Sequence, residues 1–368
     1  MIFILLIIIL LMAIFVNYYV HRLKISTVAG APIMAIGIVI KGIFTESMAG
    51  PVISDLLFYC MMLLTYWIII HYTFDLYQAT FYSSHLEHPI LSFSIGTWVA
   101  ALSVMSVVLS DKDFPFLART VFTINVFIWL LYFGWMIRNY AAIFRKIKNY
   151  IHQIQGGLLL TCVATQSIVI AGSVAYRQGL SASFFKTLFL IGSLLYLLNV
   201  GLIVYRYITT RNKDLTESWT NTNCIIHGAL SITGVSFTFA FSGMKNAALI
   251  IWIISLLLFV LVELIEILRG IQRIKKLGWI KAIFTYSPTQ WARVFTFGMF
   301  LFFTERIYSG KDSLIDYLQS GVIVSLPTMI IALILMEAVL LIIHLYKTMK
   351  DNRRRYVHVP THKNSRNL

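Results

Sequence analysis

The chain has 368 residues, of which 59% are hydrophobic and only 12% are charged. Soluble proteins carry charge on about one quarter of their residues, so this composition excludes a soluble globular domain and indicates a polytopic membrane protein. The net charge of +15 is then explained by basic loops beside a membrane, and no nucleic-acid partner is expected.

Eleven apolar segments follow one another along the chain, and spans of this kind fit a hydrocarbon core of about 30 Å. The first segment, within residues 1–24, lacks the basic start and the cleavage site of a signal peptide, so we expect a retained, extra N-terminal helix. Residues 25–348 then form one membrane domain, and residues 349–368 form a basic tail that is expected to lack regular structure from Asp351 onward. Ten core helices are expected near residues 27–45, 54–75, 89–110, 117–137, 157–176, 183–206, 219–243, 246–269, 290–306 and 320–348.

Lysine and arginine are distributed unequally between alternate loops. If successive loops alternate sides, 21 of these residues lie on one side and eight on the other, and Arg293 lies within a helix. The positive-inside rule places the richer side in the cytoplasm. We therefore expect a multi-pass protein of the plasma membrane with an outside N-terminus and a cytoplasmic C-terminus. The basic run Arg138–His152 is expected to be a short helical linker at the inner surface.

Small and polar residues are concentrated in every second core helix, counted from residue 27. A helix that faces only lipid has no use for such residues, whereas a helix that lines a water-filled path does. Close helix packing also favours small residues, but packing alone gives no reason for strict alternation. We therefore predict an all-α fold in which the odd-numbered helices surround a central pore and the even-numbered helices face lipid. The candidate pore residues are Gly96, Gln166, Asn223 and His227, of which His227 equally fits a hydrogen-bonded packing role.

Few ionisable residues fall inside the expected helices, where each is costly and therefore a functional candidate. Arg293 is expected either to extend toward the cytoplasm or to mark the inner mouth of an anion path with an unpaired positive charge. Lys41 is expected near the outer end of its helix, within reach of the membrane surface. Glu263 and Glu266 are one helical turn apart on an even-numbered helix and are expected to face the basic loops.

The sequence lacks the common signatures of catalysis and metal binding. It contains no Walker A motif, no G-x-S-x-G and no H-E-x-x-H, and Cys60, Cys162 and Cys224 form no C-x-x-C pair. The run from His85 to His88 has metal-binding residue types but no distant partner, so no metal site is expected there. The sequence therefore predicts neither an enzyme nor a cofactor.

Two short motifs resemble one family of membrane proteins. The run His88-Pro89-Ile90-Leu91-Ser92-Phe93 is similar to the H-P-[VIL]-L-S-[SF] start of the third core helix in the tellurite-resistance/dicarboxylate transporter family, to which the slow anion channels of plant guard cells also belong. The run from Trp291 to Gly298, W-A-R-V-F-T-F-G, is similar to a ninth helix that ends S-F-S-F-G in that family. Helix number and loop lengths also agree over most of the chain.

The resemblance implies five helical hairpins around a quasi-fivefold axis, with a pore in each protomer of a homotrimer. It implies passage of small inorganic or organic anions, such as chloride, nitrate, malate or other dicarboxylates, and tellurite resistance as a phenotype. It also implies that a phenylalanine of the ninth helix occludes the pore; by residue match this is Phe297, with Phe295 as the alternative. Arg293 departs from a neutral or aromatic position of the family. An ion-coupled transporter on another fold, a polytopic membrane enzyme and a sensor are the alternative functions.

Overall fold

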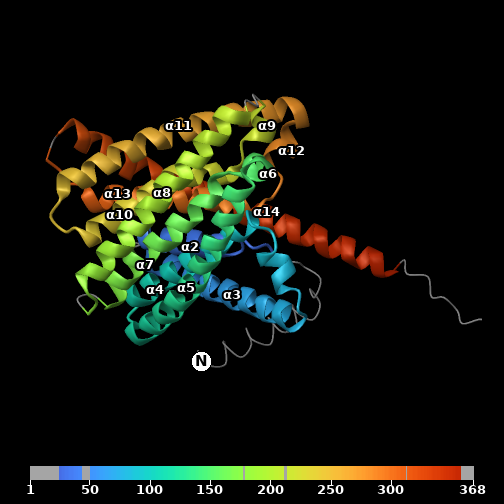
Figure 1. The fold of residues 1–368 in the computed structure, drawn as a ribbon, viewed down its shortest axis with the longest axis horizontal. Coiled ribbons are helices and arrows are strands. Elements are labelled where there is room, and N and C mark those ends of the chain that lie inside the picture. The colour runs from blue at the N-terminus through green and yellow to red at the C-terminus, as the bar shows by residue number, and fades with distance from the viewer. Residues whose placement is uncertain (1–24, 44–49, 177–178, 211–213, 312, 358–368) are drawn as a thin grey trace, which may run out of the picture.

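The computed structural model describes residues 25–43, 50–176, 179–210, 214–311 and 313–357. Throughout this part of the chain every regular element is a helix, and eight of these helices are long and apolar enough to cross a membrane (Figure 1). The predicted all-α polytopic membrane fold is therefore confirmed. The extra helix expected within residues 1–24 lies outside the described residues.

The ten core helices form five hairpins, each made of a short helix followed by a long one. The short helices are α2 (Gly30–Gly42), α4 (Gly96–Asp111), α7 (Leu160–Tyr176), α10 (Ile225–Ala240) and α13 (Trp291–Ile307). The long helices are α3 (Gly50–Tyr77), α5 (Pro115–Arg145), α8 (Ala182–Thr210), α11 (Lys245–Leu277) and α14 (Leu314–Val357). All ten lie where the sequence predicts core helices, but the long ones extend several residues beyond the predicted ends.

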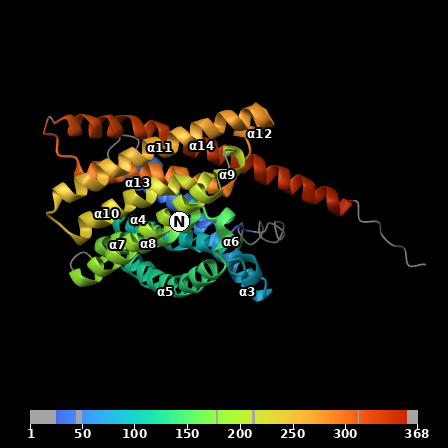
Figure 2. The same ribbon diagram turned by 45° about the horizontal axis from the view of Figure 1, so that its top comes forward.

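The short helices form a closed inner ring in the order α2, α4, α7, α10, α13 and back to α2. Each long helix packs outside the short helix of its own hairpin, and α5, α8 and α11 also contact the next inner helix. Figure 2 shows α13, α10 and α4 between the outer helices α11 and α14 on one side and α5 on the other.

Burial separates the two layers clearly. The apolar spans of α4, α7 and α10 are 72–89% buried, whereas those of the five long helices are 22–39% buried. Leu257 on α11 and Leu335 on α14 are 64% and 61% exposed, so the outer surface is apolar and suits lipid. This arrangement agrees with the predicted inner position of the odd-numbered core helices.

Four inner helices begin with a short 3-10 turn, and these turns pack side by side in chain order at one end of the ring. They are η2 (Leu91–Ile95), η4 (Gly156–Leu159), η5 (Asn221–Cys224) and η6 (Pro288–Gln290). The same end holds the loops that are rich in lysine and arginine, so we call it the basic end. Its loops contain the short helices α6 (Ile147–Tyr150), α9 (Leu215–Ser218) and α12 (Trp279–Ile283).

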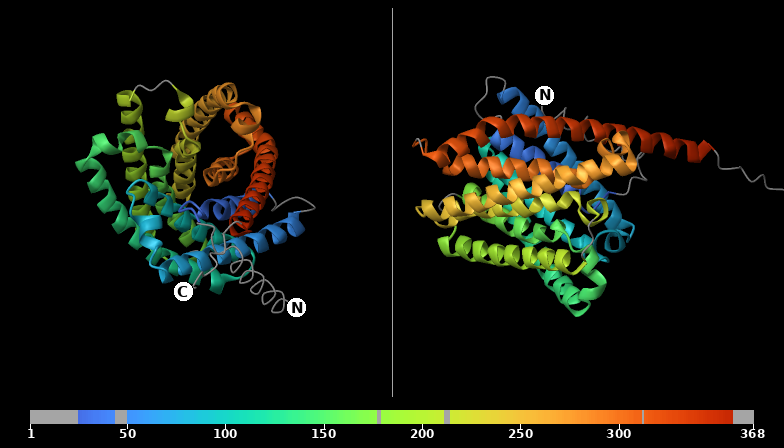
Figure 3. Two further views of the ribbon diagram at one scale, coloured as in Figure 1. Left: turned by 90° about the vertical axis from the view of Figure 1, so that its right-hand side faces the viewer. Right: turned by 90° about the horizontal axis from the view of Figure 1, so that it is seen from above.

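The last helix, α14, projects beyond the other helices at the basic end (Figures 1 and 3). The expectation that the chain lacks regular structure from Asp351 is therefore wrong as far as Val357. Lysine, arginine and aspartate continue a helix at little cost, and neither glycine nor proline interrupts this stretch. Residues 358–368 lie outside the described part of the chain.

Glycine brings the inner helices into backbone contact. At Gly96 on α4, a Cβ atom would lie 2.6 Å from the carbonyl oxygen of Leu160 on α7 and 2.8 Å from the hydroxyl oxygen of Tyr132 on α5. Neither distance is sterically allowed, and a backbone carbonyl does not move aside easily. Gly96 therefore fits where α4, α5 and α7 meet because it has no side chain.

Replacing Gly96 with alanine tests this packing. We expect Gly96→Ala to lower the free energy of unfolding by about 1–3 kcal/mol, because the added methyl group overpacks a rigid contact. Thermal unfolding of the detergent-solubilised protein measures the change. Gly134→Ala on α5 is the control, since a Cβ there meets no atom within 4 Å and alanine favours the helix by up to about 1 kcal/mol. Equal effects of the two variants would contradict the close contact at Gly96.

Candidate functional site

A small cavity lies at the centre of the inner ring. Its volume is about 30 Å³, and every inner helix contributes to its wall. We call it the axial cavity; its lining residues are Ile38, Lys41, Ser103, Val104, Val107, Ser167, Ile170, Ile232, Met299 and Phe302. A void of this size holds one or two water molecules. Because all five inner helices line it, the axial cavity marks the axis of the ring.

The axial cavity identifies which face of α13 points toward the axis. Met299 and Phe302 line the cavity, and successive residues of an α-helix are about 100° apart. Phe295 precedes Met299 by four residues, so it lies on the same face, one turn nearer the basic end. Its side chain is 1% exposed. Phe295 is therefore the phenylalanine that the helix directs toward the axis.

The opposite face of α13 packs against the outer helix α11. The Phe297 ring centroid lies 4.9 Å from that of Phe259 on α11, and Phe300 stacks on the same Phe259 ring at 5.1 Å. Thr304, further along this face, accepts a hydrogen bond from the indole nitrogen of Trp252. Phe297 thus points between α13 and α11 and away from the axial cavity, so the structure favours the alternative residue, Phe295, over the residue-matched Phe297.

Arg293 lies on the same α11-facing side of α13 and is paired with two acids. Its Nη2 atom lies 3.2 Å from Glu266 Oε1, and its Nε atom lies 3.8 Å from Glu263 Oε1. The expected unpaired positive charge at Arg293 is therefore wrong. Glu263 and Glu266 likewise do not simply face the basic loops, because they point from α11 toward the inner ring.

His227 on α10 completes an ionic cluster, which we define as His227, Glu263, Glu266, Arg269 and Arg293. His227 Nε2 lies 3.7 Å from Glu263 Oε1, and Arg269 Nη1 lies 2.6 Å from Glu266 Oε1. Arg269 also donates to the Asn221 side chain at the start of α10. The cluster joins α10, α11 and α13 near the basic end.

The other predicted pore residues hold the inner ring together and do not line the axial cavity. Gln166 donates from Nε2 to the Phe189 carbonyl on α8 and accepts from Ser236 on α10. Asn223 accepts from the Gly156 amide and donates to the Tyr207 hydroxyl. Gly96 occupies the packing contact described above. Each of these three residues connects neighbouring helices.

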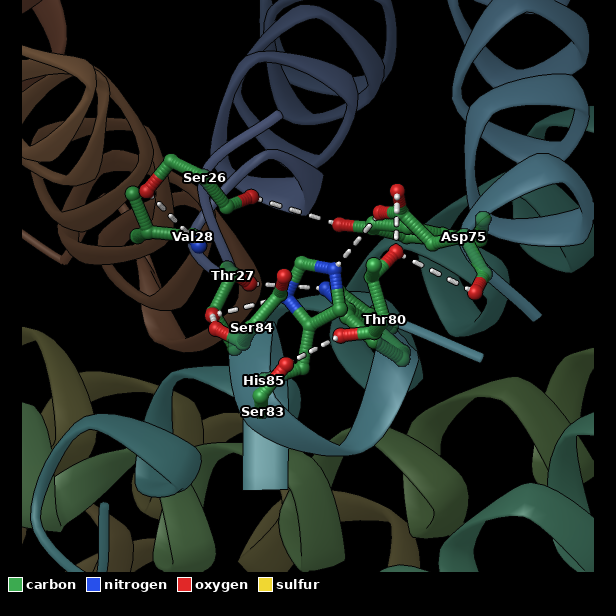
Figure 4. A network of polar contacts seen from close by, with 10 residues as sticks. Ser26, Thr27, Val28, Asp75, Thr80, Ser83, Ser84 and His85 are labelled. Atoms are coloured by element: carbon green, nitrogen blue, oxygen red, sulfur yellow. Dashed lines mark hydrogen bonds and ion pairs between the residues drawn. The ribbon is translucent and has the colours of Figure 1, made fainter. Parts of the chain in front are cut away.

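A second polar network surrounds His85 (Figure 4). His85 Nδ1 lies 2.9 Å from Thr27 Oγ1, and His85 Nε2 lies 3.2 Å from Asp75 Oδ2. The indole nitrogen of Trp98 donates to the Thr27 carbonyl at 2.7 Å. His85 therefore connects the start of α2 to the end of α3. It does not turn toward His88, whose Nδ1 accepts from the Leu91 amide.

A second, larger hollow lies off the ring axis. It encloses about 770 Å³ between the α10–α11 and α13–α14 turns, at the end opposite the basic end. Its lining includes Lys245, Arg306 and Lys311. No residue of α2, α4 or α7 lines it. It is therefore separate from the axial cavity.

A closed ring of short helices around an axial cavity, enclosed by longer lipid-facing helices, is the architecture of a channel or transporter. Residues 25–345 match the sequence model of a family described as voltage-dependent anion channel, and the chain belongs to this family. No curated protein matches the chain. The family implies anion transport across the membrane, and its members are channels or transporters.

The sequence contains a signal for the ionic cluster. Glu263 and Glu266 are three residues apart on an otherwise apolar helix, and Arg293, Phe297 and Phe300 recur at helical spacing on α13. Such a pair of acids requires a basic partner inside the membrane. Phe259, which contacts both His227 and Phe297, has no distinguishing signal among the 26 phenylalanines of the sequence.

A double-mutant cycle tests whether Arg293 acts as an ion-pair partner of Glu266. We expect Arg293→Met and Glu266→Met each to destabilise the protein, because each leaves opposite charge uncompensated. The double variant should lose less than the sum, with a coupling of roughly 0.5–3 kcal/mol by unfolding in detergent. The exposed pair of Lys276 and Asp214 is the control, with an expected coupling below about 1 kcal/mol. Strict additivity for Arg293 and Glu266 would show that the pair does not form.

Proposed function

We propose that anions cross the membrane along the axis of the inner ring and that Phe295 closes this path. The observation that carries the proposal is the axial cavity, which all five inner helices line. Phe295 lies one turn from the cavity on the axial face of α13. The family of the chain supplies the class of solute, since it implies anion transport.

In this proposal the path is narrow and lined by apolar side chains at the depth of Phe295. One helical turn before the cavity-lining residues Ile38, Val104 and Ser167 come Met34, Ala100 and Val163, which share their helix faces. All three are buried. A benzyl ring inserted between such side chains blocks an ion sterically and excludes the water that would hydrate it.

Lys41 provides the positive charge that favours anions. Among the described residues that line the axial cavity, Lys41 alone carries a charge. Its Nζ atom pairs with Asp111 Oδ2 at 2.6 Å, and its side chain remains 26% exposed. A cation beside a narrow path raises the local concentration of anions. This role replaces the one predicted for Arg293, because Lys41 lines the axial cavity and has one acidic partner, whereas Arg293 does not line it and is held by both Glu263 and Glu266.

The finer properties are proposals supported by the sequence resemblance and the charge pattern. Chloride, nitrate, malate and other dicarboxylates are the proposed solutes, with tellurite as a further one. A homotrimer, a plasma-membrane location and a cytoplasmic C-terminus stay predictions. The basic end would then face the cytoplasm, so Phe295 would close the path from that side of the cavity.

Truncating the gate tests the proposed function directly. We expect Phe295→Ala to raise anion flux into proteoliposomes by roughly tenfold or more, which corresponds to lowering a barrier by about 1.4 kcal/mol. The panel of anions is chloride, nitrate, malate and tellurite. Flux is compared at equal amounts of reconstituted protein, as judged by size-exclusion profile and thermal unfolding.

Two variants control for the loss of a buried ring. Phe122→Ala on α5 removes a benzyl group that is also buried but lies in the outer layer, and it should leave flux near that of the wild type. Phe297→Ala should raise flux less than Phe295→Ala. If Phe297→Ala is the more active variant, the gate is Phe297, as the sequence motif implies. If none of the three raises flux, the axial path is not gated by phenylalanine.

Removing the charge at the cavity tests the role of Lys41. We expect Lys41→Met to lower anion flux, most clearly at low ionic strength, where screening is weak. Lys112→Met is the matched control, because Lys112 pairs with Asp55 at 2.5 Å at the same end of the molecule without lining the cavity. A uniform loss at all salt concentrations, shared by both variants, would argue against an electrostatic role for Lys41.

A further inference from the structure

His227 is an ionisable side chain without a hydrogen-bond partner inside a membrane domain. It is 0% exposed, and neither ring nitrogen makes a hydrogen bond in the described part of the chain. Buried polar groups are normally paired, and an exception calls for an explanation. Within a membrane, such a residue is a functional candidate.

Glu263 favours a proton on His227, whereas the burial of the ring and the charge of Arg293 oppose it. Glu263 Oε1 lies 3.7 Å from His227 Nε2, which is slightly beyond hydrogen-bond distance, and the same oxygen has no hydrogen-bond partner among the described residues. Adding a proton to the imidazole allows Nε2–H to donate to Glu263 after a movement of less than about 1 Å. The approach converts two unsatisfied buried atoms into one charge-assisted hydrogen bond.

The other titratable groups on the surrounding helices are two arginines, two cysteines, a tyrosine and two further glutamates, Glu266 and Glu337. Arg293 on α13 keeps its closer contact with Glu266 when Glu263 turns toward His227, and Arg269 stays on Glu266 and Asn221. Cys224 in η5 is buried near the cluster. The titratable groups on α7 and α8 contact other residues: Cys162 contacts Thr233, and Tyr196 donates a hydrogen bond to the Ile226 carbonyl. Glu337 on α14 is buried within electrostatic reach of Arg293, and its Oε2 atom has no hydrogen-bond partner in the described part of the chain.

The imidazole of His227 also touches the helix that carries the gate. Its ring centroid lies 4.8 Å from Phe259 on α11 and 6.0 Å from Phe297 on α13. Phe297 and Phe295 are two residues apart and therefore lie about 200° apart around α13. Movement of His227 toward Glu263 changes its contact with Phe297, so the packing behind α13 changes on the side opposite Phe295.

We propose that His227 and Glu263 form a proton-binding site whose occupation opens the axial path. The proton enters from the basic end and binds His227, and the resulting imidazolium donates to Glu263. The changed contact between His227 and Phe297 then allows α13 to shift and Phe295 to leave the axis. This inference rests on the proposed gate at Phe295 and extends it with a regulator.

Flux as a function of pH tests the proposal. Anion flux through the wild-type protein should rise several-fold as the pH falls from about 8 to about 5, the range in which histidine gains a proton. His227→Gln should abolish this rise, and Glu263→Gln should move its midpoint about one pH unit lower or more, because an opposite charge is lost. Phe295→Ala should be highly active and independent of pH.

A matched histidine controls for general effects of acid. His85 is also buried and also lies beside a carboxylate, that of Asp75, but it is remote from α13 in the sequence and contacts α2 and α3. His85→Gln should keep the pH dependence of the wild type. If His227→Gln keeps it as well, the proposal is wrong; if Glu263→Gln alone abolishes it, the proton binds to the acid and the assignment to His227 is overturned.

A second measurement distinguishes a failure of the proposed proton site from a failure of the proposed gate at Phe295. NMR of protein with isotope-labelled histidine reports ring protonation without any flux, and the His227 signal is assigned by its loss in His227→Gln. The signal should titrate between about pH 5 and pH 8 and should respond to Glu263→Gln. If it titrates while Phe295→Ala leaves flux unchanged, the gate alone fails. If it does not titrate in this range, the proton site fails whatever Phe295 does.

Discussion

Backbone contact between the short helices is the constraint on which the structure depends. Without a hydrophobic driving force between helices in lipid, close approach at small residues supplies the packing energy. Gly30 meets the Thr97 carbonyl, Gly96 meets the Leu160 carbonyl, and Gly156 meets the Thr222 carbonyl. These contacts close the ring from α2 to α10 and exclude lipid from its inside. Polar side chains on the inner helices can then find partners, because every inner helix is surrounded by protein.

The alternation of polar and apolar segments was sufficient to predict which helices lie inside. It could not predict which face of each inner helix points toward the axis, because these helices are buried almost all round and their polar residues are not confined to one stripe. Gln166 and Asn223 are therefore correctly placed on inner helices but serve contacts between helices. The residues that line the axial cavity are mostly apolar, with Ser103, Ser167 and Lys41 as exceptions.

The choice between Phe295 and Phe297 shows the same limit at one position. Two residues along a helix change direction by about 200°, and a motif match locates a helix more securely than it fixes the rotation of that helix. The contacts of Phe297 with His227 and Phe259 settle its direction. The ionic cluster was likewise hidden in the sequence, because its members come from three helices and only the fold brings α10, α11 and α13 together. Pairing Arg293 with two acids reduces the cost of burying each charge.

The inner helices have 13–17 residues, whereas the outer helices have 28–44. At 1.5 Å per residue the α-helical parts of the inner ring are about 20–26 Å long, and the 3-10 turns that precede four of them supply the remaining length for a hydrocarbon core of about 30 Å. In the proposed path the electrical resistance would be concentrated at its narrowest level, beside the axial cavity, so most of the transmembrane voltage would fall there instead of across the whole bilayer. A unit charge that crosses the full potential gains about 2.3 kcal/mol per 100 mV. An anion that moved by a single helical turn past this level would therefore gain a large share of that energy, and its passage would depend steeply on the membrane voltage.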